Sequence, residues 1–142
     1  METSDNITDT QPKRPQLLTI LCILTFIGSG MGVIGFLSVT VNYEASMEAL
    51  RTLYADLPEA SFLLQAPRDF FLISFILMAF SVAGAVFMWN MRKVGFHLYT
   101  SAQLIYLALP FIYFHNQANP FLNVILTALF VYLYARNLQS MR

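Results

Sequence analysis

Four long apolar runs divide this 142-residue chain and restrict what it can fold into. The first run, residues 17–41, would reach about 37 Å as an α-helix, which exceeds the ~30 Å hydrocarbon core of a bilayer. A cleaved signal peptide is the competing interpretation, but its apolar run is usually shorter, about 7–15 residues. The first run therefore predicts a membrane span, and the later runs predict three more, at residues 70–91, 94–114 and 120–138.

Composition points to lipid as the main solvent of the folded chain. Hydrophobic residues make up 57% of the sequence and charged residues 11%, whereas about 25% of the residues in a soluble domain are charged. No stretch outside the four spans is long enough for a second soluble domain. The predicted fold class is therefore all-α, an integral membrane four-helix bundle with a membrane domain over residues 17–138. The net charge of zero gives no indication of a nucleic-acid partner.

Basic residues are distributed unevenly around the predicted spans. Six of the eight would lie on one side of the membrane and two on the other, so the positive-inside rule places both termini and residues 92–93 in the cytoplasm. Residues 42–69 would then form an outer loop. Trp89, Tyr132 and Tyr134 are expected at the inner interface, where aromatic side chains are common. The six basic residues on the cytoplasmic side are Lys13, Arg14, Arg92, Lys93, Arg136 and Arg142, and the two on the outer side are Arg51 and Arg68.

Two segments outside the spans differ in pattern. Residues 1–16 are polar and predict a disordered cytoplasmic tail. The outer loop contains the stretch EASMEALRTLYADL at residues 44–57, which spaces its apolar residues as in an amphipathic helix until Pro58 interrupts it. A solvated connector is the alternative for this loop. The apolar residues of the stretch are Met47, Leu50, Leu53, Tyr54 and Leu57.

Small residues recur at helical spacing in the first two spans. Gly28, Gly32 and Gly35 fall on one face of the first span, and small residues let two helix backbones approach closely in a bilayer. Close helix packing is the favoured interpretation, and a passage for a substrate or ion lined by the same residues is the alternative. The second span carries a matching stripe of Ser74, Ser81, Gly84 and Ala85.

The third span has one polar and aromatic face. Its residues recur every three or four positions, so they line up along a single side of a helix. This face could line a ligand pocket between helices, or it could supply hydrogen bonds that hold the bundle together. The face consists of Tyr99, Gln103, Tyr106, Pro110 and Tyr113, and the weak candidates for ligand binding are Tyr99, Gln103, Tyr106 and, in the fourth span, Asn123.

Residue patterns that would indicate chemistry are scarce. No acidic or basic residue falls near the middle of a span, which argues against proton-coupled transport. His97 and His115 would lie near opposite membrane faces, so they do not predict a shared metal site. The single cysteine, Cys22, lies in an apolar run and predicts a buried, unreactive thiol. We therefore expect no catalytic residue, no metal and no cofactor.

The stretch RPQLLTILCILTFIGSG, residues 14–30, resembles the opening of a group of uncharacterised small bacterial four-span membrane proteins. The resemblance covers the first span alone, and it implies a bacterial inner-membrane location without implying an activity. The function expected from the sequence is that of a non-enzymatic assembly or accessory subunit, as a homo-oligomer or with a larger membrane partner. The alternative is a small transporter or channel that uses the face of Tyr99, Gln103 and Tyr106.

Overall fold

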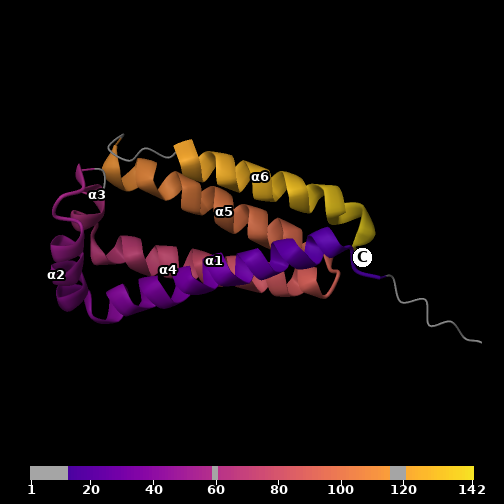
Figure 1. Cartoon of the computed structure of the whole chain (residues 1–142), viewed down its shortest axis with the longest axis horizontal. Helices are drawn as coiled ribbons and strands as arrows, with labels where there is room; N and C mark the ends of the chain where they lie inside the picture. The colour runs from indigo at the N-terminus through magenta and orange to yellow at the C-terminus, as the bar shows by residue number, and fades with distance from the viewer. Residues whose placement is uncertain (1–12, 59–60, 116–120) are drawn as a thin grey trace, which may run out of the picture.

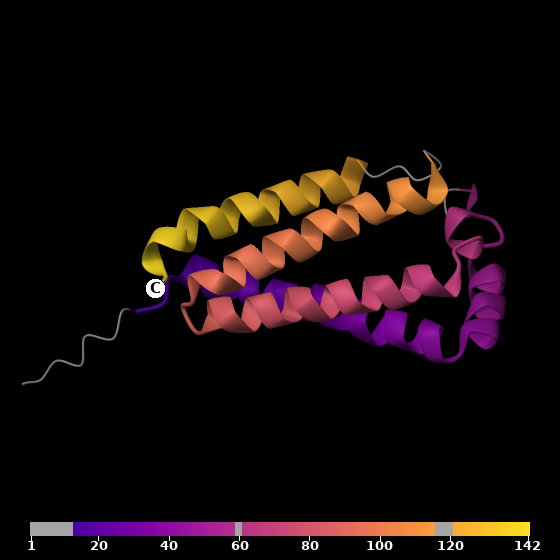
Figure 2. The same cartoon turned by 180° about the vertical axis from the view of Figure 1, so that it is seen from behind.

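The computed structural model describes residues 13–58, 61–115 and 121–142, and the regular elements in these ranges are all helices. Four long helices run lengthwise, with α1 and α4 in one layer and α5 and α6 in the other (Figures 1 and 2). Two short helices close one end of the bundle, and the start of α1 and the C-terminus lie at the opposite end (Figure 1). The elements are α1 (Gln16–Val41), α2 (Tyr43–Leu53), α3 (Ser61–Leu64), α4 (Arg68–Trp89), α5 (Lys93–Phe114), α6 (Phe121–Asn137) and the 3₁₀ turn η2 (Leu138–Ser140).

The long helices coincide closely with the four apolar runs of the sequence. Among the described residues, three segments are long and apolar enough to cross a membrane: Gln16–Val41, Arg68–Trp89 and Phe121–Ser140. Helix α5 is as long as α4, at 22 residues, but it carries polar side chains such as His97 and Gln103 in its first half. The all-helical fold is thus observed, and length and composition support three spans rather than the four expected. The predicted tail lies mostly outside the described residues, as does Pro120.

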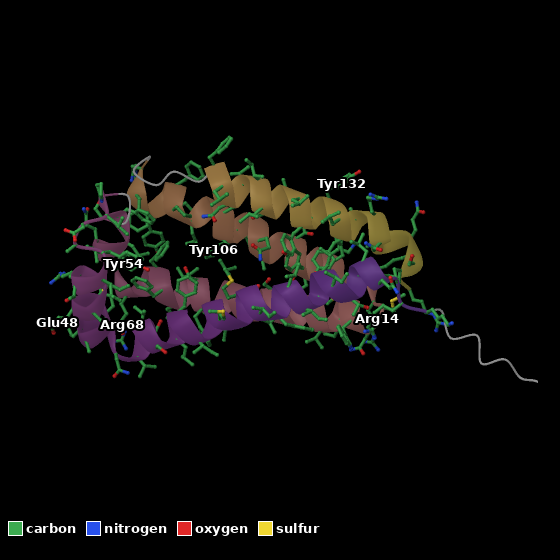
Figure 3. The ribbon with its side chains drawn as sticks, viewed as in Figure 1. Arg14, Glu48, Tyr54, Arg68, Tyr106 and Tyr132 are labelled. Atoms are coloured by element: carbon green, nitrogen blue, oxygen red, sulfur yellow. The ribbon has the colours of Figure 1, made fainter. Side chains whose placement is uncertain are left out.

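Exposed surface on the long helices is largely apolar. Large aliphatic side chains such as Ile34, Leu104 and Leu122 are exposed on α1, α5 and α6. Charged side chains of the described residues lie at the two ends of the bundle: Glu48 and Arg68 mark the α2 end, and Arg14 lies at the opposite end (Figure 3). An apolar middle with charged ends is the surface expected of a protein that sits in a bilayer.

Two clusters of buried side chains form the core. The termini-end cluster draws on all four long helices, whereas the α2-end cluster contains no residue of α6. Helix α6 therefore joins the core through its C-terminal half. The termini-end cluster consists of Leu18, Leu21, Cys22, Met88, Tyr99, Tyr134 and Met141, and the α2-end cluster of Met47, Ala66, Phe70, Phe71, Leu77, Leu109 and Phe114.

The amphipathic stretch of the outer loop forms α2, which lies across the end of the bundle (Figure 2). The helix ends at Leu53, before the predicted end at Pro58, and the side chains of Leu53 and Leu57 are exposed. Met47 is the residue of α2 that enters the α2-end cluster. A hydrogen bond of 2.8 Å from Tyr43 Oη to the backbone carbonyl of Ala66 ties the start of α2 to the segment before α4.

Close helix packing through glycine involves Gly84, on the small-residue stripe predicted for the second span, and Gly95 of α5, rather than Gly28 and Gly35 of α1. A Cβ added to Gly28 or Gly35 would meet no heavy atom within 4 Å, so the expected close contact is not met at these positions within this chain. At Gly32 the added Cβ would lie 3.2 Å from Met78 Cγ. The tightest approach joins α4 to α5, because a Cβ on Gly95 would lie 2.5 Å from the carbonyl oxygen of Gly84.

The buried face of α1 explains this difference. It is formed by Leu18, Leu21, Cys22, Thr25 and Ser29, which recur every three or four residues and follow one side of the helix. After Thr25, the buried face continues through Ser29, one position beyond Gly28. Helix α1 is therefore rotated so that Gly28 lies at the margin of the contact with α4.

Candidate functional site

A cavity of about 410 Å³ lies between α1, α5 and α6, and Met78 of α4 also lines it. Each of the four candidates for ligand binding lines this cavity: Tyr99, Gln103 and Tyr106 from α5 and Asn123 from α6. The structure therefore brings the candidate residues of the two helices together around one space. The remaining lining residues are Leu24, Thr25, Gly28, Ser29, Met78, Leu126, Thr127 and Phe130.

The cavity exists because α6 is attached at one end. Tyr134 is fully buried, and its hydroxyl shares a hydrogen bond of 2.7 Å with Thr25 Oγ1 of α1. Its ring packs edge-on against Tyr99 of α5, with the ring centroids 5.0 Å apart. In the first half of α6, large apolar side chains such as Leu122 and Leu129 stay exposed. The first half of α6 thus forms one wall of the cavity and does not fill it.

Gln103 links three helices through a chain of hydrogen bonds. Its Nε2 donates to Ser81 Oγ of α4 over 3.0 Å, and Ser81 Oγ shares a hydrogen bond of 3.1 Å with Ser29 Oγ of α1. The amide of Gln103 therefore supplies an interhelical bond while its side chain also lines the cavity. The same side chain thus supplies an interhelical hydrogen bond and borders the cavity.

Two other polar groups at the cavity have no protein partner among the described residues. Neither the hydroxyl of Tyr106 nor the side-chain amide of Asn123 makes a hydrogen bond there. The ring of Tyr106 packs against Phe36 of α1, with a centroid separation of 6.2 Å, which fixes the side chain among the long helices (Figure 3). The Tyr106 hydroxyl and the Asn123 amide are available to a bound molecule.

Apolar clusters flank the cavity along the bundle. The termini-end cluster lies on one side along the bundle and the α2-end cluster on the other. Tyr99 belongs to the first cluster, and Tyr106 packs against the second. This arrangement leaves a partly polar site between two apolar clusters.

Residues predicted for helix packing occupy the α1–α4–α5 contact. Ser81, Gly84 and Ala85 are buried, and Ala85 accepts a long hydrogen bond of 3.8 Å from Cys22 Sγ at its backbone carbonyl. Ser74 is buried as well, and its Oγ has no hydrogen-bond partner.

Sequence reasoning assigned no role to three hydroxyl-bearing residues of the cavity lining, Thr25, Ser29 and Thr127. A useful signal was the spacing of four between Thr25 and Ser29, which puts two hydroxyls one turn apart in an apolar run.

No group of three or more His, Cys, Asp or Glu residues that could hold a metal ion occurs in the part of the chain that the structure describes. No family model, curated protein or solved structure matches this chain. The described residues thus form an all-helical fold with three segments apolar and long enough to cross a membrane and an uncharged, partly polar cavity between the helices.

Proposed function

We propose that this chain is an integral membrane protein in which all four long helices cross the bilayer. Helix α5 supports the fourth crossing because it packs closely against α4, through Gly84 and Gly95, and is equally long. Its most polar central side chain, Gln103, is bonded to Ser81 inside the bundle. A helix whose polar groups are satisfied internally can cross a bilayer at a lower mean hydropathy than one that faces lipid on all sides.

The orientation we propose has both termini and the turn between α4 and α5 in the cytoplasm of a bacterial cell, with α2 outside. The charge distribution supports it: the described residues at the termini end include six basic side chains and no acidic one, while the α2 end carries Glu44, Glu48, Asp56 and Asp69. The bacterial inner membrane is proposed from the resemblance of the first span alone.

The function we propose is non-enzymatic binding of a small molecule in the cavity between α1, α5 and α6. The observation that supports it is the convergence of Gln103, Tyr106 and Asn123 on one space of about 410 Å³, which lies in the range typical of ligand pockets. Unpartnered polar groups in hydrocarbon are costly, so a molecule that satisfied them would be held there. Binding of this kind is also the first step of the small-transporter alternative. A channel is less favoured, because apolar clusters flank the site along the bundle.

A second candidate function is assembly with a larger membrane protein or with another copy of this chain. The observation in its favour is the exposed first half of α6, where Leu122, Ile125 and Leu129 have no contact in the core clusters. A partner helix could pack against this face and α1. The chain would then be an accessory subunit, as the sequence suggested.

Filling the cavity tests the first function. Gly28 lines the cavity, and a side chain added there has open space, so Gly28→Leu should fold normally and occupy the site. Gly35→Leu is the matched control, because Gly35 has equally open space and does not line the cavity. The two variants and the parent chain would be purified from membranes in mild detergent, and organic extracts would be analysed by mass spectrometry.

The expected result is a small molecule that co-purifies in near-stoichiometric amount with the parent chain and with Gly35→Leu, and is lost from Gly28→Leu. Loss of a co-purifying protein from Gly28→Leu, with no small molecule in any sample, would favour assembly. If the extracts and the protein content of the three samples were identical, cavity binding would be refuted.

A further inference from the structure

We infer that the cavity takes an uncharged lipophilic molecule bearing a hydroxyl or carbonyl oxygen, and that this molecule enters from the bilayer between α1 and α6. The inference rests on the proposed function, since it specifies the ligand class of the same site. Three features of the lining support it: the absence of charge, the surplus of hydrogen-bonding groups and the position of the opening.

The lining excludes a charged ligand. The cavity is bordered by none of the Asp, Glu, Lys, Arg or His residues in the described part of the chain. The described charges lie at the two ends of the bundle, and apolar clusters lie between them and the site. A charged group placed at this depth would lose its hydration without gaining a counter-ion, which is strongly unfavourable.

The hydrogen-bonding groups require a ligand with a polar atom. Gln103 uses Nε2 for Ser81, so its carbonyl oxygen is free to accept a hydrogen bond. The hydroxyl of Tyr106 is free to donate, and the amide of Asn123 can do both. A pure hydrocarbon would leave all three groups unmet, whereas a hydroxyl or carbonyl oxygen would accept from Tyr106 and satisfy part of this set.

The opening faces the apolar surface of the bundle. Two lining residues at the edges of α1 and α6, Leu24 and Leu126, are 48% and 45% exposed. Gly28 lies one turn beyond Leu24 on α1 and adds no side chain to obstruct the gap. Since the exposed surface around these residues is apolar, a ligand would reach the site from lipid and must itself partition into lipid.

Photoreactive probes test the ligand class directly. The full chain would be reconstituted in phosphatidylcholine vesicles with one of four diazirine-bearing C16 probes: an alcohol, a ketone, a hydrocarbon or a trimethylammonium salt. After photolysis, labelled peptides would be identified by mass spectrometry. We expect the alcohol and the ketone to label cavity residues such as Leu126 and Phe130 several-fold more than the other two probes.

Tyr106→Phe tests whether the probe forms a hydrogen bond in the cavity or only fills it, because the substitution removes one hydroxyl that has no protein partner. Labelling of the cavity by the alcohol and the ketone should fall about 2-fold to 13-fold, the effect of one hydrogen bond of about 0.5–1.5 kcal/mol. Tyr113→Phe is the control, since Tyr113 lies on α5 outside the cavity lining and should leave labelling unchanged.

Other outcomes distinguish the inference from the proposed function. Equal labelling of the cavity by all four probes, or no effect of Tyr106→Phe, would overturn the ligand class while leaving binding in the cavity intact. Preferential labelling by the trimethylammonium probe would also overturn it. If no probe labelled the cavity, both the ligand class and the proposed function would be wrong.

Discussion

At the scale of the residue, Gln103 combines an interhelical hydrogen bond with a place in the cavity lining. Its bond to Ser81 is an interhelical hydrogen bond, a class worth about 1 kcal/mol or less in membrane proteins. We expect Gln103→Leu to lower the free energy of unfolding by about 1 kcal/mol, because the serine pair of α1 and α4 can persist without the amide. Gln139→Leu, at an exposed position of η2, is the control. Reversible unfolding in mixed micelles measures both, and equal stability of the two variants would show that the bond contributes nothing.

At the scale of the element, two contacts hold the bundle together: the α4–α5 packing and the docking of α6. Gly95→Ala would place a Cβ 2.6 Å from Met88 N, so we expect a loss of about 1–3 kcal/mol through overpacking. Gly35→Ala adds the same methyl group in open space and should cause no loss of stability. If both variants unfolded at the same denaturant concentration, the close approach of α4 and α5 would be contradicted.

Docking of α6 depends on the residues that follow it. Met141 is buried in the termini-end cluster, and the backbone of Arg142 exchanges hydrogen bonds with Met91 and Lys93 at the α4–α5 turn. We expect Met141→Ala to cost about 2 kcal/mol, because it removes buried apolar contacts. Met31→Ala, at a side chain 70% exposed on α1, should cost far less. A similar loss of stability in the two methionine variants would show that the last residues do not anchor α6.

At the scale of the whole molecule, the proposed orientation rests on the uneven charge of the two ends. Single cysteines at Ala49 of α2 and Ser140 of η2, each in a Cys22→Ser background, would report the two ends. Serine at position 22 keeps a donor for the carbonyl of Ala85. In intact bacterial cells, a membrane-impermeant maleimide should label Ala49→Cys and spare Ser140→Cys until the membrane is broken. Labelling of Ser140→Cys in intact cells would show that the C-terminal end is outside the cell and would contradict the proposed topology.

Local sequence determined where the helices lie. The length of each apolar run and the polar residues between the runs are local properties of the chain. The amphipathic pattern of α2 and the placement of charge at the two ends are of the same kind. The polar face of α5 was also predictable, since it follows from spacing along one helix. These features can be predicted without knowing which helices pack against each other.

Tertiary packing decided how each helix is rotated and where the helices meet. A helix that is apolar on all sides carries no hydropathy signal for its rotation, because lipid and protein interior are equally apolar. Shape then sets the contact: Gly84 meets Gly95 while Gly28 faces a cavity, and Tyr134, expected at the membrane interface, is buried against Thr25. The cavity itself arises because α6 docks through its C-terminal half, and no pattern within a single helix encodes that.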